Sequence, residues 1–309
     1  ADLTRHTLRH VSSHFAEDPL RVLRGMQFIA RFGLRPTQET IDICRTMTPE
    51  GLAPERQMGE WSKLLTQGVW ISQGLAFLRS VNWVDYYPEL KRTIGCRQDP
   101  EWHPEGDVWN HTLECLDRFA AARAVERQSA RADDLLVGFA VLCHDFGKPF
   151  CTRYDRVKRH IRSLGHDVAG VEPTKMFLRR LTNEERLLRD VPPLVQMHMR
   201  PYAMWRSQSS DGAVRRLSTK VCSIEALVRV AAADLTGTEA CDWLLSTARR
   251  LAVEAAAPKP LLLGRHLIAL GMKPGPRFGE ILQKTYEAQL DGRFSTTQKG
   301  MEYVKARFG

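Results

Sequence analysis

The sequence predicts an all-α protein, and three observations support this prediction. Apolar residues recur at helical spacing along most of the 309 residues. Strict apolar–polar alternation, which is typical of a half-buried strand, is nearly absent, so we expect no substantial sheet. Proline and glycine fall between the periodic segments, where helices begin and end. The composition, with 43% hydrophobic and 26% charged residues, is ordinary for a globular protein.

The helical pattern divides into three expected domains, at residues 1–100, 101–254 and 255–309. The first should be elongated, the second a helical bundle, and the third a small helical tail. In the first domain a helical pattern covers residues 15–47, with Pro19 suited to a first helical turn and Gly33 to a helix end.

Further helices are expected along the rest of the chain. Two lie between residues 55 and 90, and the proline- and glycine-containing stretch that follows is expected to be a linker. The bundle should contain helices at 108–119, 135–143, 168–181, 194–198 and 213–233. After an alanine- and proline-rich hinge at 255–260, the tail should contain a helix at 279–290.

Charge and cysteine content indicate the environment and the partner. No apolar run approaches the ~18 residues that span a bilayer, and the N-terminus does not resemble a signal peptide. Seven cysteines without a CxxC pair predict reduced thiols in a cytoplasmic protein that has no membrane contact. The net charge of +9 favours an anionic partner such as RNA; the alternative is a basic surface of no special use.

Histidines and aspartates at the ends of apolar helices form the main candidate site. His144 and Asp145 follow the apolar run 135–143, and Asp234 follows another at 226–233. Burying such groups is costly unless they are paired, and one or two divalent transition metal ions (Ni, Mn, Co or Fe) would pair them. The candidate ligands are His111, His144, Asp145, His166, His198 and Asp234. The set contains no cysteine, which argues against a structural zinc site; for a single histidine the alternative is a hydrogen-bonded core residue.

Such a site predicts phosphate chemistry. Asp145 could bridge two ions, and two ions ~3.5–4 Å apart can activate water and stabilise an in-line displacement at phosphorus. Lys148, just after the turn at Gly147, would place a positive charge near the phosphate. We therefore assign catalytic roles to Asp145 and Lys148.

Three strings of residues carry a family resemblance. Residues 102–112 (WHPEGDVWNHT), 142–148 (LCHDFGK) and 165–170 (GHDVAG) resemble the HD domain of bacterial CCA-adding tRNA nucleotidyltransferases, part of the HD superfamily of metal-dependent phosphohydrolases. The resemblance implies that residues 101–254 hydrolyse 2′,3′-cyclic nucleotides and phosphomonoesters. It also implies core ligands at His111, His144, Asp145 and Asp234, with His166 and His198 serving a second metal or the phosphate.

The N-terminal domain carries a second resemblance. Residues 8–24 resemble the neck of class II tRNA nucleotidyltransferases, the family of bacterial CCA-adding enzymes and poly(A) polymerases. Asp18 and Arg21 match the positions that read the incoming base, and Arg24 shares their helix face. An acceptor and a donor one turn apart can pair with a base edge. The alternative is a surface ion pair.

The tail resembles the part of these enzymes that grips tRNA, over residues 267–279. Lys273 and Arg277 lie beside the expected start of a helix, where free N–H groups can bind an RNA phosphate. The alternative is an ordinary proline–glycine turn with basic neighbours.

One departure from the family limits the prediction. The catalytic head of the family carries a glycine–serine element, a DxD pair that holds Mg²⁺ and an RRD motif, and none occurs here. We therefore expect the chain to be a portion of a longer parent, and nucleotide addition to belong to that parent with its head. The neck does not separate CCA addition from poly(A) addition, and the oligomeric state stays open.

Three hypotheses follow. The first is an HD-type phosphohydrolase joined to tRNA-binding helices, with cyclic phosphates or nucleotides as substrates and tRNA as partner. The second is a non-catalytic tRNA-binding fragment that needs a separate nucleotidyltransferase head. The third is a helical scaffold whose metal ligands serve only stability.

Overall fold

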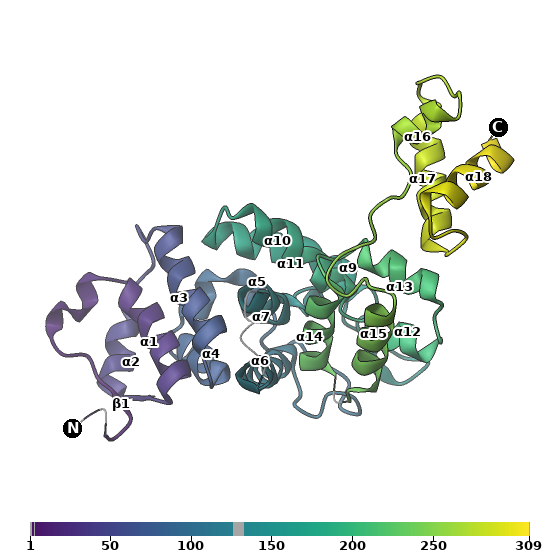
Figure 1. Cartoon of the computed structure of the whole chain (residues 1–309). Coiled ribbons are helices and arrows are strands. Elements are labelled where there is room, and N and C mark those ends of the chain that lie inside the picture. The colour runs from purple at the N-terminus through teal and green to yellow at the C-terminus, as the bar shows by residue number, and fades with distance from the viewer. Residues whose placement is uncertain (1, 3, 126–132, 236, 309) are drawn as a thin grey trace. The chain divides into compact units, whose positions relative to one another are not determined.

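The computed structural model describes residues 2, 4–125, 133–235 and 237–308, and it confirms the all-α class (Figure 1). Strands form only two short ladders in this part of the chain. β1 (Thr7–Leu8) pairs in parallel with β2 (Arg35–Pro36), and β3 (Arg153–Asp155) pairs antiparallel with β4 (His160–Arg162). Among the described helices, none combines the length and the apolar character that crossing a bilayer requires.

The contacts divide the chain into two compact units. Unit 1 comprises residues 1–199 and 229–236, and unit 2 comprises residues 200–228 and 237–309. The helix α14 (Ile224–Asp234) therefore begins in unit 2 and ends in unit 1. The predicted domain boundaries at residues 100 and 254 stay a prediction.

The N-terminal part of unit 1 is a group of packed helices. The longest two are α1 (Leu20–Phe32) and α3 (Pro54–Gln67), and α1 packs against both α3 and α4 (Ile71–Ser80). The shorter ones are α2 (Gln38–Arg45), α5 (Pro88–Lys91), η1 (Ser13–Glu17) and η2 (Trp83–Tyr86). As predicted, α1 ends at Gly33, whose φ of 61° is the left-handed conformation that favours glycine.

The rest of unit 1 surrounds a buried central helix. α7 (Asp134–Cys143) packs against α3, α6 (Val108–Val125) and α11 (Glu185–Met197), so its sequence is apolar on all sides. The other helices of this part are α8 (Lys148–Cys151), α9 (His166–Ala169) and α10 (Val171–Leu181). α10 packs against α3 and α11, and α9 packs against α8 and α11. The single helix expected at 168–181 is thus two helices that meet at Gly170, and the segment expected at 194–198 is the end of the longer α11.

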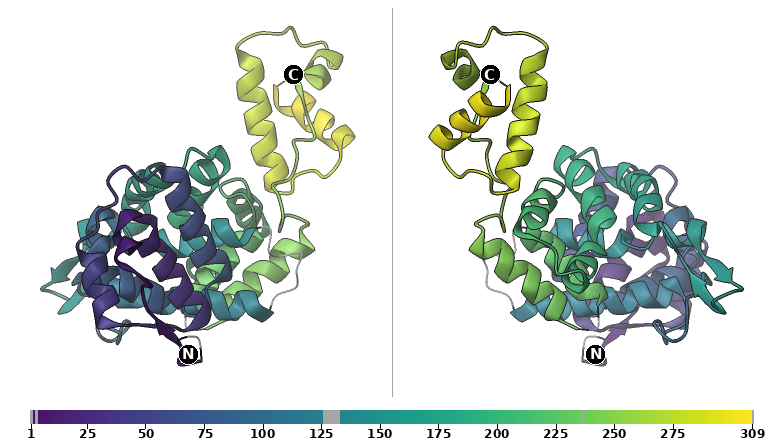
Figure 2. Two further views of the ribbon diagram at one scale, coloured as in Figure 1. Left: turned by 90° about the vertical axis from the view of Figure 1, so that its left-hand side faces the viewer. Right: turned by 90° about the vertical axis from the view of Figure 1, so that its right-hand side faces the viewer.

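Unit 2 consists of helices joined by turns and loops, without a strand among its described residues. Besides the first residues of α14, it contains α12 (Arg200–Arg206), α13 (Asp211–Ser218), α15 (Glu239–Arg250), α16 (Gly264–Ala269), α17 (Arg277–Leu290) and α18 (Thr297–Phe308). The helix expected at 213–233 is wrong as one element, because the chain leaves helical geometry between α13 and α14. Figure 2 shows α16, α17 and α18 gathered together, around a small core of Leu262, Leu267, Ile281 and Val304.

Candidate metal centre

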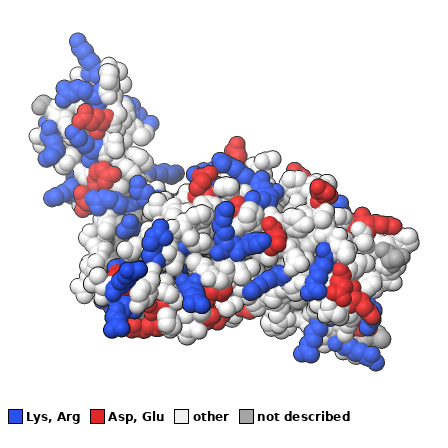
Figure 3. Space-filling view, turned by 180° about the vertical axis from the view of Figure 1, so that it is seen from behind, with Lys and Arg blue, Asp and Glu red and all other residues white. Residues whose placement is uncertain are grey.

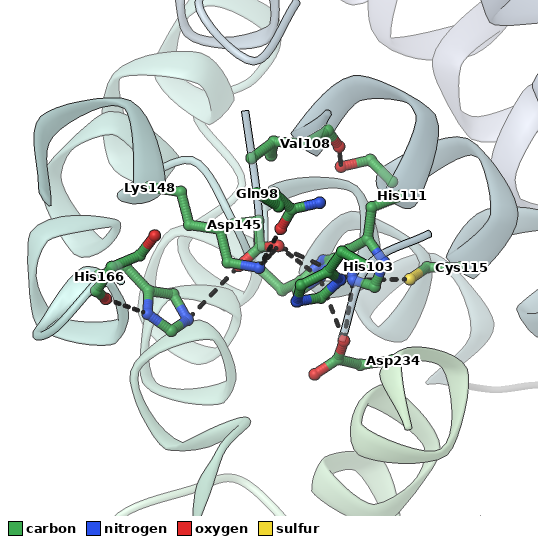
Figure 4. A network of polar contacts seen from close by, with 12 residues as sticks. Gln98, His103, Val108, His111, Cys115, Asp145, Lys148, His166 and Asp234 are labelled. Atoms are coloured by element: carbon green, nitrogen blue, oxygen red, sulfur yellow. Dashed lines mark hydrogen bonds and ion pairs between the residues drawn. The ribbon is translucent and has the colours of Figure 1, made fainter. Parts of the chain in front are cut away.

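The six predicted ligands lie in unit 1 and come together at one place. Figure 4 shows His111, Asp145, His166 and Asp234 there. His111 lies in the first turn of α6, and Asp234 is the last residue of α14. The other ligands lie at helix ends: His144 and Asp145 directly after α7, His166 at the start of α9, and His198 directly after α11. The centre is buried, with His144 and Asp145 each only 1% exposed.

Local structure fixes these helix ends. The Oδ1 of Asp107 accepts a hydrogen bond of 2.9 Å from the backbone N–H of Asn110, which caps the turn that carries His111. A side chain at Gly147 would overlap the carbonyl oxygen of His166. Glycine at 147 therefore allows the turn after Asp145 to lie directly against the backbone of His166.

The carboxylate of Asp145 lies between two groups of ligands, as Figure 4 shows. Its Oδ1 is 3.4 Å from His166 Nε2, and its Oδ2 is 3.3 Å from His144 Nε2 and 3.8 Å from His111 Nε2. The Oδ1 of Asp234 is 2.9 Å from His111 Nε2 and 3.8 Å from His144 Nε2. One carboxylate thus serves both groups.

All four histidine rings are oriented in the same way. Each holds its Nδ1 within 2.8 Å of an acceptor that has no hydrogen to give, so Nδ1 carries the proton. These acceptors are the carbonyls of Val141, Ser163 and Val195 for His144, His166 and His198, and the carboxylate of Glu105 for His111. Each Nε2 lone pair then faces the centre, which is the arrangement of metal-ligating histidines.

The residues fit a divalent cation. His166 Nε2 and His198 Nε2 lie 3.2 Å apart, and with both Nδ1 atoms protonated two lone pairs face each other. His144 Nε2 and Asp145 Oδ1 are buried without a hydrogen-bond partner among the described residues. Unpaired buried polar atoms are costly, and a metal ion between them removes that cost. The three groups of possible ligands at this place include all six predicted residues.

Burial and neighbouring charges shift the pKa values of the ligands, which keeps some in the metal-binding form and others protonated in the metal-free protein. Burial alone would raise the pKa of Asp145, but Lys148 and His144 hold that pKa well below its usual range, so the carboxylate stays ionised. Burial and the charge of His144 lower the pKa of His198 to about 4, which keeps this imidazole neutral. Burial lowers the pKa of His111, because it disfavours the charged imidazolium, but the hydrogen bond to Asp234, together with the other neighbouring groups, outweighs this effect and raises that pKa to about 10. A proton or a metal ion is therefore needed between His111 and Asp234.

Lys148 lies at the centre of this network but is itself buried, at 7% exposure. Its Nζ is 2.7 Å from Asp145 Oδ2 and 2.5 Å from the amide oxygen of Gln98. The lysine thus supplies the positive charge nearest to the carboxylate that both ligand groups share. Its assigned role at a phosphate stays a prediction.

Three residues that the predicted set does not contain lie in the same network: His103, Glu105 and Cys115. Glu105 Oε1 accepts from His103 Nδ1 at 2.9 Å and from His111 Nδ1 at 2.6 Å. Cys115 Sγ lies 3.4 Å from His111 Nε2. The spacing of four residues, which puts Cys115 on the helix face of His111, could have revealed the cysteine. Glu105 lies in a loop, where no periodicity predicts its position.

The predicted base-reading residues lie at the start of α1. Arg21 and Arg24 line a cavity of 240 Å³, together with Arg9 and the rings of Phe15 and Phe28. Asp18 Oδ2 accepts from Arg56 Nη2 at 2.9 Å, and its Oδ1 accepts from the backbone N–H of Leu20. Arg21 donates to the carbonyl of His14. The two arginines thus share a cavity, and the base-reading role of all three residues stays a prediction.

The predicted phosphate-binding residues lie in unit 2, at the turn that leads into α17. Lys273 and Arg277 are both exposed, and Arg277 is the first residue of that helix. Figure 3 shows one face of the protein, on which lysine and arginine side chains are widely spread among fewer acidic groups. The role of Lys273 and Arg277 in RNA binding stays a prediction.

Comparisons with known proteins place the chain in a family, although no family model matches it. It is 33% identical over 301 residues to the "Multifunctional CCA protein" of Halorhodospira halophila. This match covers 92% of this chain and 68% of that protein. Proteins of the same name from Acinetobacter baumannii and Xylella fastidiosa are 33% and 38% identical, over 76% and 58% of this chain. The chain spans 57% and 42% of their lengths.

Solved structures share the fold. A CCA-adding enzyme in complex with CTP matches 99% of this chain with a TM-score of 0.58 and 18% identity, and the chain covers 64% of that enzyme. The Thermotoga maritima CCA-adding enzyme in complex with tRNA matches the whole chain with a TM-score of 0.53 and 18% identity, with 66% of the enzyme covered. The relatives and the folds agree with the motifs in the sequence. The chain belongs to the multifunctional CCA protein family, a group of class II tRNA nucleotidyltransferases.

Proposed function

We propose that unit 1 contains an HD-type metal-dependent phosphohydrolase centre, and that the chain as a whole binds tRNA. The observation that carries the first part is the orientation of the four histidines: the Nε2 atoms of His111, His144 and His166 face the carboxylates of Asp145 and Asp234, and that of His198 faces His166 Nε2. Four Nδ1 atoms fixed by acceptors, with four Nε2 atoms gathered around the same two carboxylates, are expected of a metal centre rather than of core histidines.

The residues supply two adjacent ligand groups. Asp145 Oδ1, His166 and His198 form one, and Asp145 Oδ2, His111, His144 and Asp234 form the other. Divalent ions such as Ni²⁺, Mn²⁺, Co²⁺ or Fe²⁺, when bound there, supply Lewis acidity for phosphoryl transfer to water. Asp145 joins the two groups and stays ionised. Lys148 Nζ, 2.7 Å from Asp145, offers a positive charge for a phosphate.

The proposed substrates are 2′,3′-cyclic phosphates and 2′- or 3′-phosphates, free or at an RNA end. The resemblance of the HD strings to phosphohydrolases supports this choice. We infer that tRNA is the partner, because one structural neighbour is a complex with tRNA and the net charge is +9. Seven free cysteines support a cytoplasmic protein. Nucleotide addition, with Mg²⁺, is proposed only for the longer parent that carries a catalytic head.

Basic charge and the exposed Lys273 and Arg277 favour a second candidate, a tRNA-binding part without hydrolytic activity. On this alternative the ligands of unit 1 would bind metal for stability alone. Salt-dependent tRNA binding is expected of both candidates, so it cannot separate them. Metal-dependent turnover separates them.

The decisive experiment is hydrolysis of 2′,3′-cyclic AMP by the chelated chain after addition of Ni²⁺, Mn²⁺, Co²⁺ or Mg²⁺. Asp145→Asn keeps the shape of the side chain and removes its charge, so it should abolish metal-restored turnover. Asp242→Asn, on the exposed surface of α15, is the matched control and should retain turnover. If no metal restores turnover in the folded protein, the hydrolase proposal fails for this substrate and the tRNA-binding candidate gains.

A further inference from the structure

A thiol lies inside one of the two ligand groups. Cys115 is fully buried on α6, one turn after His111, and its Sγ is 3.4 Å from His111 Nε2. Figure 4 shows the sulfur directed at the His111 ring. Ligand atoms of Cys115, His111, His144 and Asp234 all lie within 4.8 Å of one another.

The distance between the sulfur and the His111 ring suits two ligands of one ion. Metal–sulfur bonds of about 2.3 Å and metal–nitrogen bonds of about 2.1 Å put sulfur and nitrogen of a tetrahedral site about 3.6 Å apart. The observed 3.4 Å between Cys115 Sγ and His111 Nε2 is close to that value.

An independent observation indicates a ligand at this place. His144 Nε2 is buried, has no hydrogen-bond partner among the described residues, and belongs to the same group of four. Asp145 forms a separate group of possible ligands with His166 and His198. Asp145 Oδ2 adjoins the group of four at 3.3 Å from His144 Nε2, so Cys115 offers an additional ligand atom for the position that His111, His144 and Asp234 share with Asp145.

The surroundings compensate a negative charge on the sulfur. Arg118 Nη2 donates to Cys115 Sγ at 3.3 Å, and Arg118 Nε donates to the carbonyl of Ala233 at 2.7 Å. The guanidinium is thus held in place by the end of α14, next to Asp234. A cation adjacent to a thiol favours its thiolate form, which is the form that binds metal.

We propose that Cys115 is a thiolate ligand of the metal ion held by His111, His144 and Asp234. On binding, the thiol proton leaves to solvent and the sulfur is neither oxidised nor reduced. A sulfur ligand makes this position select ions that accept sulfur, such as Zn²⁺ or Co²⁺, over Mg²⁺, which prefers oxygen. The inference rests on the proposed metal centre. It adds which kind of ion binds at the ligand group of His111, His144 and Asp234.

The test is a titration of the metal-free chain with Co²⁺, followed by absorption spectroscopy. A cobalt–thiolate bond gives a charge-transfer band in the near ultraviolet, whereas cobalt held by histidine and carboxylate gives only the weaker visible bands. We expect the wild type to show both, and Cys115→Ser to keep the visible bands and lose the ultraviolet band. Cys44→Ala, which removes a buried thiol outside the three groups of possible ligands, is the matched control and should keep both.

Affinity gives a second measurement. Cys115→Ala should weaken Zn²⁺ binding by at least about tenfold, the lower end of the losses seen when even indirect supports of a metal site are removed. Visible cobalt bands without an ultraviolet band in the wild type, or an ultraviolet band that survives Cys115→Ser, would overturn the inference and leave the metal centre intact. Absence of both bands in the folded wild type would overturn the metal centre as well.

Discussion

His166 and His198 face each other through their Nε2 atoms at 3.2 Å, and each donates its Nδ1–H to the carbonyl of the residue three positions earlier. His144 makes the same contact with Val141. The backbone thus fixes the tautomer in which the two facing nitrogens are acceptors. Such a pair is unfavourable without a cation between the two nitrogens. Asp145 Oδ1, 3.4 Å from His166 Nε2, would then balance part of the charge of that cation.

Removing one ring of this pair should remove one ion. We expect His198→Ala to lower the bound metal from about two ions per chain to about one, because the second group keeps its own ligands. In the metal-free state the substitution should cost little stability, since it relieves the facing lone pairs. Metal content after gel filtration and thermal unfolding with chelator measure the two effects. His14→Ala, at an exposed position, is the control, and unchanged metal content in His198→Ala would contradict the two-ion arrangement.

Glu105 should act through His111 rather than on a metal directly. Its Oε1, 2.6 Å from His111 Nδ1, fixes the ring and increases the electron density at Nε2. Loss of such a support typically weakens metal binding by about 10–100-fold. We expect this loss for Glu105→Ala and a smaller one for Glu105→Gln, which keeps an acceptor oxygen. Isothermal titration with Zn²⁺ measures it. Glu114→Ala, an exposed carboxylate on α6, should leave the affinity unchanged, and an equal loss there would refute the role of Glu105.

Metal binding should stabilise unit 1. A ligand that binds only the folded state adds about 2.7 kcal/mol when its free concentration is 100 times Kd. We expect the unfolding midpoint to fall on chelation and to recover on addition of Co²⁺ or Zn²⁺. In Asp145→Asn, metal addition should no longer raise the unfolding midpoint. A midpoint that does not respond to metal in the wild type would count against the centre, because binding to the folded state alone must raise stability.

The helical class could be predicted from the sequence because helical periodicity and helix ends are local signals. Such local signals predict α1, which ends at Gly33, and α7, which has a continuous apolar run. Other boundaries depend on packing. Pro192 and Pro193 favour a break by local rules, yet they lie inside α11. Gly170 permits a helix on propensity alone, but α9 and α10 meet there beside Gly147.

The candidate site was predictable to the extent that its residues close apolar helices. His144, Asp145 and Asp234 were found in that way, and the structure brings them together with His111. Glu105 escaped prediction because a loop residue acquires its partner only through the tertiary fold. The position of Lys148 could not be predicted either, because its Nζ bonds to Gln98, which lies fifty residues earlier in the sequence.

A buried ion pair in unit 1 gives a stability prediction. Both oxygens of Glu89 on α5 accept from Arg180 on α10, at 2.7 and 3.1 Å, and the Glu89 side chain is 1% exposed. Arg180→Ala leaves this carboxylate buried without its counter-charge, which typically costs about 3–5 kcal/mol. We expect the lower end, about 3 kcal/mol, because Arg180 is 31% exposed. Urea unfolding measures it. Arg179→Ala, at an exposed neighbouring position, should cost less than about 0.5 kcal/mol.

RNA binding by the tail can be separated from the effect of bulk charge. Lys273 and Arg277 are exposed at the turn that leads into α17, and the N-terminus of a helix favours an anion such as a phosphate. Lys284, on the same helix, is held by Glu280 at 2.6 Å. We expect Lys273→Ala and Arg277→Ala each to weaken tRNA binding and to lower the slope of log affinity against log salt by roughly 1.

Lys284→Ala removes the same charge and is the matched control, measured by fluorescence anisotropy with labelled tRNA at several salt concentrations. Its slope should stay at the wild-type value, because the ammonium is already neutralised by Glu280. If all three substitutions lower the slope equally, the tail contributes only diffuse positive charge. If only Lys273→Ala and Arg277→Ala do so, a phosphate contact at the start of α17 explains the difference, since loss of net charge is the same in all three.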